Sequence, residues 1–265
     1  MLQVRLNPGL RGGKWARLRP LCGIDEALID GDGSVDVVAF LDRLLTRTPG
    51  TTVEPGRAAD LAVCDCDRLC ASIYLAYFGE RIKGRVTCVA CIEPFEMDFS
   101  LPSLMEDLDG RQSAKVSGPD DEGIFTLPGG QRFRLPTAGE HRQVMALDAD
   151  DAVADLWSRC VVEGEPAVDT AAIEAAMDQV GATLDLDLDA TCPHCAMLQT
   201  VRFDIQSYLF RALGYERQFL NYEAHYIAKA YGWAYEEILG LTREDRRSFV
   251  RLIQSDRPAR RRMER

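Results

Sequence analysis

The sequence predicts an α+β fold, mainly helical, with a split zinc ribbon (two Cys-x-x-Cys β-hairpins) that carries a long insertion. Three observations predict it: two matched Cys-x-x-Cys pairs, alternation of apolar and polar residues beside each pair, and helical periodicity over most of the remaining chain. The pairs are Cys88 with Cys91 and Cys192 with Cys195. A pair at a hairpin tip directs two thiolates to one point, so two tips supply a closed tetrahedral Zn²⁺ site. Four thiolates leave no free coordination position, which makes the expected zinc structural.

Strand-like alternation flanks both pairs. Residues 85–87 and 95–99 surround the first pair, and residues 184–189 and 201–205 surround the second. A half-exposed strand explains the row of three Leu and three Asp in 184–189 better than a calcium repeat does. The predicted segments are a helical region over 1–83, ribbon halves over 84–102 and 182–205, an inserted hairpin with helices over 103–181, a C-terminal helical region over 206–256 and a basic tail over 257–265.

Two alternatives compete with zinc at these cysteines. The sequence Cys-Pro-His-Cys at 192–195 also occurs in thiol oxidoreductases, where the first Cys begins a helix and has a lowered pKa. That chemistry needs a helix after the motif, whereas residues 196–201 lead into a strand. The other alternative is four buried cysteines acting as small hydrophobic residues. The matched spacing and the strand flanks favour zinc.

Composition restricts the class of protein. The chain has 265 residues, long enough for a substantial core, and nine cysteines without an export signal indicate a reducing compartment and favour metal ligation. No apolar run approaches the roughly 18 residues that a membrane span needs. A net charge of −11 argues against nucleic acid as a partner, because binding phosphates needs clustered Lys and Arg. The arginine-rich end of the chain is expected to be a solvated tail.

The first 83 residues are expected to begin as an irregular arm over 1–23 and to continue with a short helix over 25–29. Ser34 is the expected N-cap of a helix over 35–47. The preceding Asp/Gly-rich turn is not a calcium loop, since Leu28 and Ala39 would occupy ligand positions.

A long helix is expected over 57–81. It carries Cys64, Cys66 and Cys70, for which packing is the expected role and disulfide pairing the alternative.

In the insertion, a polar loop is expected over 107–113 and a hairpin around Gly129 and Gly130. Thr137 and Glu140 form a capping box. Helices follow over 148–162, with Val153, Leu156, Trp157 and Cys160 on the buried side, and over 171–180.

After the second hairpin the chain is expected to be helical over 207–213, 216–231, 234–239 and 243–253, the last helix capped by Thr242. Its aromatic residues are candidates for partner binding, because Tyr and Trp are enriched at binding hot spots. The candidates are Tyr222, Tyr226, Tyr231 and Trp233. Packing in the core is the simpler expectation for them.

No catalytic constellation is evident in the sequence. The three His residues, His141, His194 and His225, have no Ser or Cys partner at a known motif spacing, and no glycine-rich nucleotide loop occurs. We therefore expect a protein that is not an enzyme and has no small-molecule substrate.

A set of short segments, in a fixed order, resembles a known family. The segments are Asp67-Arg68-Leu69, Phe78 to Ile82, the first Cys pair with Phe95-Glu96, Phe133 to Thr137, Arg159-Cys160, the Cys-Pro-x-Cys pair with Phe203-Asp204-Ile205, Tyr222 to Ala228, Tyr231-Gly232-Trp233, Glu237-Ile238-Leu239 and Arg246-Arg247. Together they resemble the baseplate and tail-assembly proteins of contractile-tailed bacteriophages and of phage-derived contractile injection systems. The departures are Cys64, Cys66 and Cys70, and Ala196 where a Gly is common.

The resemblance implies a structural or assembly role at the baseplate, with other baseplate or tail proteins as partners. It implies a place in the bacterial host cytoplasm during assembly and leaves open whether the protein stays in the finished virion tail. A zinc-ribbon nucleic-acid binder and, after it, a thiol oxidoreductase are the alternative functions.

Overall fold

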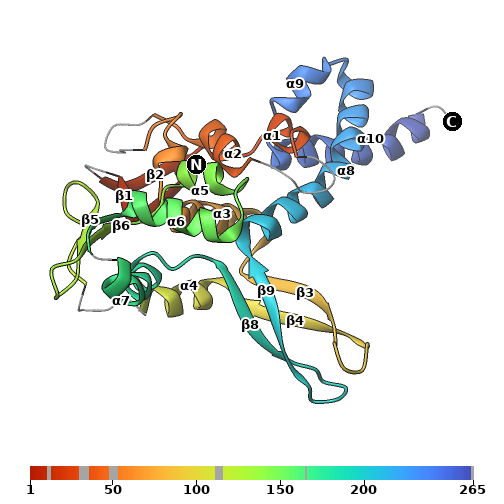
Figure 1. Ribbon diagram of the computed structural model, residues 1–265. Helices are drawn as coiled ribbons and strands as arrows, with labels where there is room; N and C mark the ends of the chain where they lie inside the picture. The colour runs from red at the N-terminus through yellow and green to blue at the C-terminus, as the bar shows by residue number, and fades with distance from the viewer. Residues whose placement is uncertain (11–12, 30–35, 48–52, 111–115, 165, 264–265) are drawn as a thin grey trace. The chain divides into compact units, whose positions relative to one another are not determined.

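The computed structural model describes residues 1–10, 13–29, 36–47, 53–110, 116–164 and 166–263 (Figure 1). The expected turn at 30–33 and the Ser34 cap lie outside these residues. Helices make up 51% and strands 25%, the strands in small antiparallel sheets. The α+β prediction is therefore confirmed. By internal contacts the chain forms two compact units, one of residues 2–17 and 37–206 and the other of residue 1, 18–36 and 207–265.

The first unit begins with a β-hairpin, so the expected irregular arm is wrong. Strands β1 (Leu2–Leu10) and β2 (Gly13–Leu18) pair in a two-stranded sheet. The inward residues Val4, Leu6 and Ala16 recur with the period of two that strands require. The glycines and prolines of this segment obscured that alternation.

The expected helix over 57–81 is two elements, η1 (Ala58–Asp60) and α3 (Val63–Phe78), preceded by α2 (Val37–Leu44). Gly79 ends α3 with φ at +92°, a conformation that glycine adopts without strain. Cys64, Cys66 and Cys70 are buried free thiols, which confirms the packing role. Burial raises the pKa of each of these thiols, so they remain protonated at neutral pH.

After strands β3 (Arg81–Thr87) and β4 (Pro94–Ser100) the chain forms helix α4 (Leu101–Gly110). The loop expected over 107–113 is therefore wrong as far as Gly110. Leu101, Leu104 and Leu108 recur at the helical spacing, a pattern that the Asp residues around them obscured. Residues 111–115 lie outside the described ranges.

The expected hairpin is confirmed as β5 (Ile124–Thr126) and β6 (Arg132–Arg134), and β7 (Val161–Glu163) adds a third strand. The Thr137 capping box opens α5 (Ala138–Val144), as predicted. Helices α6 (Ala149–Cys160) and α7 (Pro166–Val180) follow, but Val153, expected to be buried, is 58% exposed.

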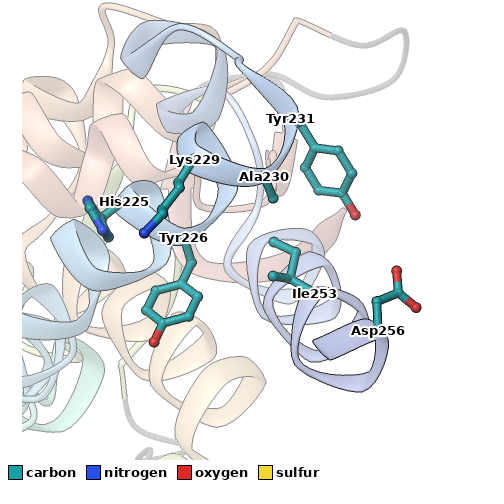
Figure 2. Close-up of a pocket in the computed structure, with 7 residues that line it drawn as sticks. All are labelled: His225, Tyr226, Lys229, Ala230, Tyr231, Ile253 and Asp256. Atoms are coloured by element: carbon teal, nitrogen blue, oxygen red, sulfur yellow. The ribbon is translucent and has the colours of Figure 1, made fainter. Parts of the chain in front are cut away.

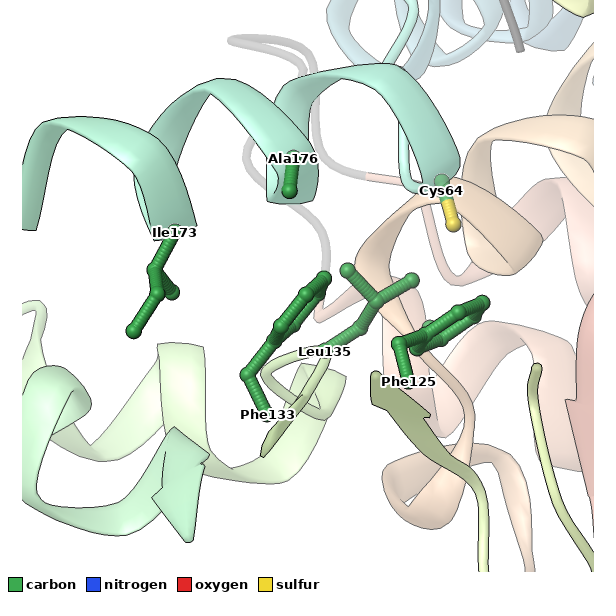
Figure 3. Packing of buried hydrophobic residues seen from close by; sticks show 7 residues of the cluster. Cys64, Phe125, Phe133, Leu135, Ile173 and Ala176 are labelled. Carbon is green, nitrogen blue, oxygen red and sulfur yellow. The ribbon is translucent and has the colours of Figure 1, made fainter. Parts of the chain in front are cut away.

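One apolar cluster joins these elements to α3. Phe125 and Phe133 stack with ring centroids 5.5 Å apart, and the side chains around them come from α3, α7 and the end of β6 (Figure 3). The buried members are Ala62, Cys64, Phe125, Phe133, Leu135, Ile173 and Ala176. The insertion is thereby fixed to the same unit as the ribbon.

Strands β8 (Asp185–Thr191) and β9 (Leu198–Asp204) form the second predicted hairpin and lead directly into α8 (Ile205–Tyr231). The two expected helices over 207–213 and 216–231 are thus one continuous helix. Gly214 interrupts the sequence pattern but costs only about 1 kcal/mol inside a helix, and the apolar positions keep their spacing across it.

The second unit contains α1 (Gly23–Ala27), α9 (Tyr235–Leu239) and α10 (Arg243–Met263), besides most of α8. Thr242 caps α10 as predicted, by accepting the Asp245 amide at 3.2 Å. Helix α10 runs past the expected end at 253 and includes residues 257–263 of the predicted tail. Leu252 on this helix is 53% exposed.

Candidate metal centre

The two Cys-x-x-Cys turns close two hairpins of identical construction. Strand β3 pairs with β4 from Arg81↔Ser100 to Thr87↔Pro94, and β8 pairs with β9 from Asp185↔Asp204 to Thr191↔Leu198. Each cysteine pair begins in the residue after the first strand, and a helix begins in the residue after the second strand. The ribbon therefore consists of two copies of one unit, hairpin followed by helix.

The backbone hydrogen bonds at the two tips correspond one to one. The amide of Cys88 donates to the carbonyl of Glu93 at 3.0 Å, and that of Cys192 donates to the carbonyl of Met197 at 2.8 Å. The amides of Ile92 and Ala196 donate back to the carbonyls of Cys88 and Cys192 at 3.0 and 2.9 Å. These tight turns place both thiols of each pair on one side of the tip.

The four sulfurs converge on one point, as the sequence predicted. Cys88 Sγ lies 3.6 Å from Cys195 Sγ, and Cys91 Sγ lies 3.7 Å from Cys192 Sγ. All four atoms lie within 4.8 Å of one another, and all four cysteines are free thiols. Sulfurs about 2.3 Å from a tetrahedral ion are separated by about 3.8 Å. The donor set therefore fits a single metal ion.

A small apolar layer supports the cluster. Cys88 and Cys192 are buried with Phe95 and Ala190, and Phe99 of β4 meets Phe203 of β9 edge to face, with centroids 5.1 Å apart. This packing brings the hairpins together below their tips. The four candidate ligands are thus preorganised by side chains from both hairpins.

Gln199 links one tip to the other and was not singled out from the sequence. Its Oε1 accepts the amide of Val89 at 2.9 Å, and its Nε2 donates to the carbonyl of Thr87 at 3.3 Å. The side chain is only 9% exposed. A polar residue at an inward position of a strand was the available signal, since buried polar groups need partners.

The thiols differ in their electrostatics. Amides of the tip, that of Cys91 foremost, donate to the Cys88 sulfur and lower the pKa of that thiol to about 6. The pKa of Cys91 is raised to about 12, because desolvation and the neighbouring thiols outweigh the amide of Glu93. One thiolate therefore forms readily, and a bound cation would displace the protons of the others.

All four candidate partner residues form aromatic contacts, and three of them are exposed. Tyr222 is 48%, Tyr231 43% and Trp233 36% exposed, while Tyr226 is partly buried. Tyr226 and Tyr231 line a pocket of about 330 Å³ between α8 and α10, with His225, Lys229, Ala230, Ile253 and Asp256 (Figure 2). Core packing, the simpler expectation, is therefore wrong for three of the four rings.

Fold and site together define an α+β protein with a split cluster of four cysteines that is able to bind a metal ion. Comparison of the chain with protein families, curated proteins and solved structures finds no match. Among the described helices, none is both long and apolar enough to cross a membrane.

Proposed function

We propose that this protein is a non-enzymatic baseplate or tail-assembly protein of a phage-type contractile tail, held together by a structural Zn²⁺. The observation that supports the structural metal is the convergence of Cys88, Cys91, Cys192 and Cys195. Four thiolates favour zinc among common divalent ions, and they fill its tetrahedral shell. A filled shell supports a structural role, because a catalytic zinc keeps a position for water or substrate.

The ion would join hairpins that are far apart in the sequence. Cys91 and Cys192 enclose the whole insertion, and closing so long a loop costs the unfolded chain considerable entropy. The contribution of zinc is therefore to the stability of the ribbon and of the elements between its halves.

The contractile-tail assignment is supported by the ordered segments of resemblance and by a surface suited to protein partners. Half-exposed aromatic residues gather on α8 and beyond it, and such rings supply binding energy at protein interfaces. The net charge of −11 favours protein over nucleic acid as the partner.

The test is an affinity purification of the full chain from bacteria that produce the contractile tail, with mass spectrometry and metal analysis on one sample. We expect tail proteins and about one zinc per chain. A variant with Tyr222→Ser and Trp233→Ser should lose the tail proteins. Tyr215→Ser is the matched control, because Tyr215 lies on α8 and is 66% exposed but is outside the candidate group.

The two halves of the proposal fail separately. Zinc without tail proteins would retain the metal site and reject the contractile-tail role. Tail proteins without zinc would retain the role and reject the structural metal. Loss of tail proteins in the Tyr215→Ser control as well would reject the aromatic residues as the binding surface.

A further inference from the structure

A groove of about 430 Å³ runs between the two ribbon hairpins and helix α4. Its volume lies in the range of about 300–1,000 Å³ that is typical of ligand sites. Residues Phe95 to Ser100 of β4 and Leu188 to Thr191 of β8 line it without a gap in sequence. Side chains alternate between the faces of a strand, so consecutive lining residues mean that the strand edges face the groove.

Both of these edges lack a neighbouring strand within the described residues, because each hairpin is a separate two-stranded sheet. On β4, hydrogen bonds from Cys88 to Glu93 and from Leu101 to Glu80 mark the two ends of the ladder with β3. Paired residues alternate along an antiparallel ladder. The backbone groups of Glu96, Asp98 and Ser100 therefore point away from β3, to the groove side.

The groove is acidic, with an apolar interior. Carboxylates line it from three elements, and the described lining includes no Lys, Arg or His. The acidic members are Glu96, Asp98, Asp107 and Asp189, and the apolar members are Phe95, Met97, Phe99, Leu104, Leu188 and Ala190. Asp98 is paired with Arg81 at 2.8 Å.

The opposite edge of β4 shows which sequence pattern suits this strand. There β3 places Arg85 opposite Glu96 and Lys83 opposite Asp98. Ile82, between the basic residues Arg81 and Lys83, is buried. A strand on the free edge with the same alternation would also place cations beside these carboxylates, and opposite charges across a strand pair are favourable.

We propose that this groove binds an extended segment of a partner protein, with alternating basic and apolar residues, as an added strand on the free edge of β4. The backbone of the segment bonds to the outward groups of Glu96 and Asp98, and this is the usual geometry of β-strand addition. Its apolar side chains contact Met97, Leu104 and Leu188. The site goes beyond the proposed function and does not depend on the contractile-tail assignment.

The first test uses the full-length, metal-loaded protein and a fluorescein-labelled peptide, Lys-Val-Arg-Ile-Lys-Val-Thr, in fluorescence anisotropy at low salt. We expect saturable binding that weakens with salt, and none with the analogue in which Glu replaces Lys and Arg. Asp107→Asn with Asp189→Asn should weaken binding about fivefold, since two charge contacts are lost. Asp187→Asn is the control for the change on β8, because it removes a single charge from that strand at a position outside the groove lining.

The second test addresses the backbone and needs no protein variant, so it holds even if the double variant fails to fold. Two peptides carry N-methyl groups on alternate sets of residues. Methylation of one set should abolish binding, and methylation of the other should leave the affinity within about twofold of that of the unmethylated peptide. The reason is that only alternate amides of an added strand face its neighbour. Equal binding of both peptides, or equal weakening by Asp187→Asn and the double variant, would overturn the proposal.

Discussion

Ile92 and Ala196 occupy the same position in the two tips, directly after the second cysteine, and both adopt the left-handed conformation, with φ at 63° and 59°. Glycine adopts this conformation freely, whereas other L-residues pay about 1–2 kcal/mol. A residue other than Gly at this position is therefore expected to weaken both turns, at Ile92 as well as at Ala196. Both turns nevertheless form the same hydrogen bonds: the amides of Ile92 and Ala196 donate to the carbonyls of Cys88 and Cys192.

Ile92→Gly should raise the free energy of unfolding of the metal-loaded protein by about 0.5–1 kcal/mol, because strain is relieved and little burial is lost. Ile92 is 69% exposed. Val89→Gly in the same tip is the control, since Val89 is 67% exposed and has no positive φ. It should lower stability slightly. Urea unfolding measures both, and equal losses in the two variants would contradict the strain argument.

Cys192→Ser should lose most of the bound zinc and destabilise the ribbon, because a serine hydroxyl is a poor ligand for this ion. Cys160→Ser is the comparison, as Cys160 is a buried thiol outside the cluster. It should keep about one zinc per chain. Metal analysis after desalting measures the content, and equal zinc in both variants would show that the cluster does not hold the ion.

The buried Asp67 should make stability depend on pH. Its carboxylate accepts the Leu184 amide and the Gln206 side chain, both at 2.8 Å. Burial foremost, aided by Asp204 and Asp185, raises its pKa from 3.8 to about 7. The folded state thus binds the proton more tightly, and this residue's contribution to stability falls as pH rises from 3.8 to about 7.

In Asp67→Asn this contribution is absent. The free energy of unfolding of the variant, measured with urea, should therefore rise relative to that of the wild type between about pH 5 and pH 8. For Glu140→Gln, the stability difference from the wild type should change with pH in the opposite direction. Arg134 foremost lowers the pKa of Glu140 to about 2, so its contribution is present above 4.5 and is lost as pH falls toward 2. If the stability difference between Asp67→Asn and the wild type is the same at about pH 5 and pH 8, the raised pKa of Asp67 is refuted.

In the second unit, Arg246 is the central residue of a buried ion-pair network. Its side chain is 1% exposed and donates to Glu223 at 2.8 Å and to Glu26 at 2.6 Å. Arg246→Met should lower the free energy of unfolding by about 3–5 kcal/mol, because the buried Glu26 and Glu223 each lose a buried cationic partner and keep only Arg243 and Arg247, respectively.

Arg247→Met is the matched control, since Arg247 is 47% exposed although it also pairs with Glu223. Arg247→Met should lower the free energy of unfolding by less than about 1 kcal/mol. Thermal or urea unfolding compares the two variants. Equal losses would mean that burial does not determine the value of these ion pairs.

Local patterns in the sequence were sufficient for several elements. The two hairpins, the α5 capping box, the Thr242 cap and the four-cysteine cluster follow from residues close together in the chain, or from two copies of one motif. The wrong expectations fall in segments where composition and periodicity disagree. The glycines of β1 and the Asp residues of α4 concealed regular spacings of apolar residues.

By itself, the sequence determined the α+β class and which four sulfurs would meet, because Cys-x-x-Cys turns and alternating strands are local and repeat in matched form. Only the tertiary structure decided what lies between and around these elements. Contacts among distant segments left one edge of β4 and one edge of β8 without a partner strand among the residues that the structure describes, placed Gln199 between the tips and buried Arg246 among carboxylates. The physical reason is that burial and free strand edges depend on which segments pack together, and local spacing does not encode that.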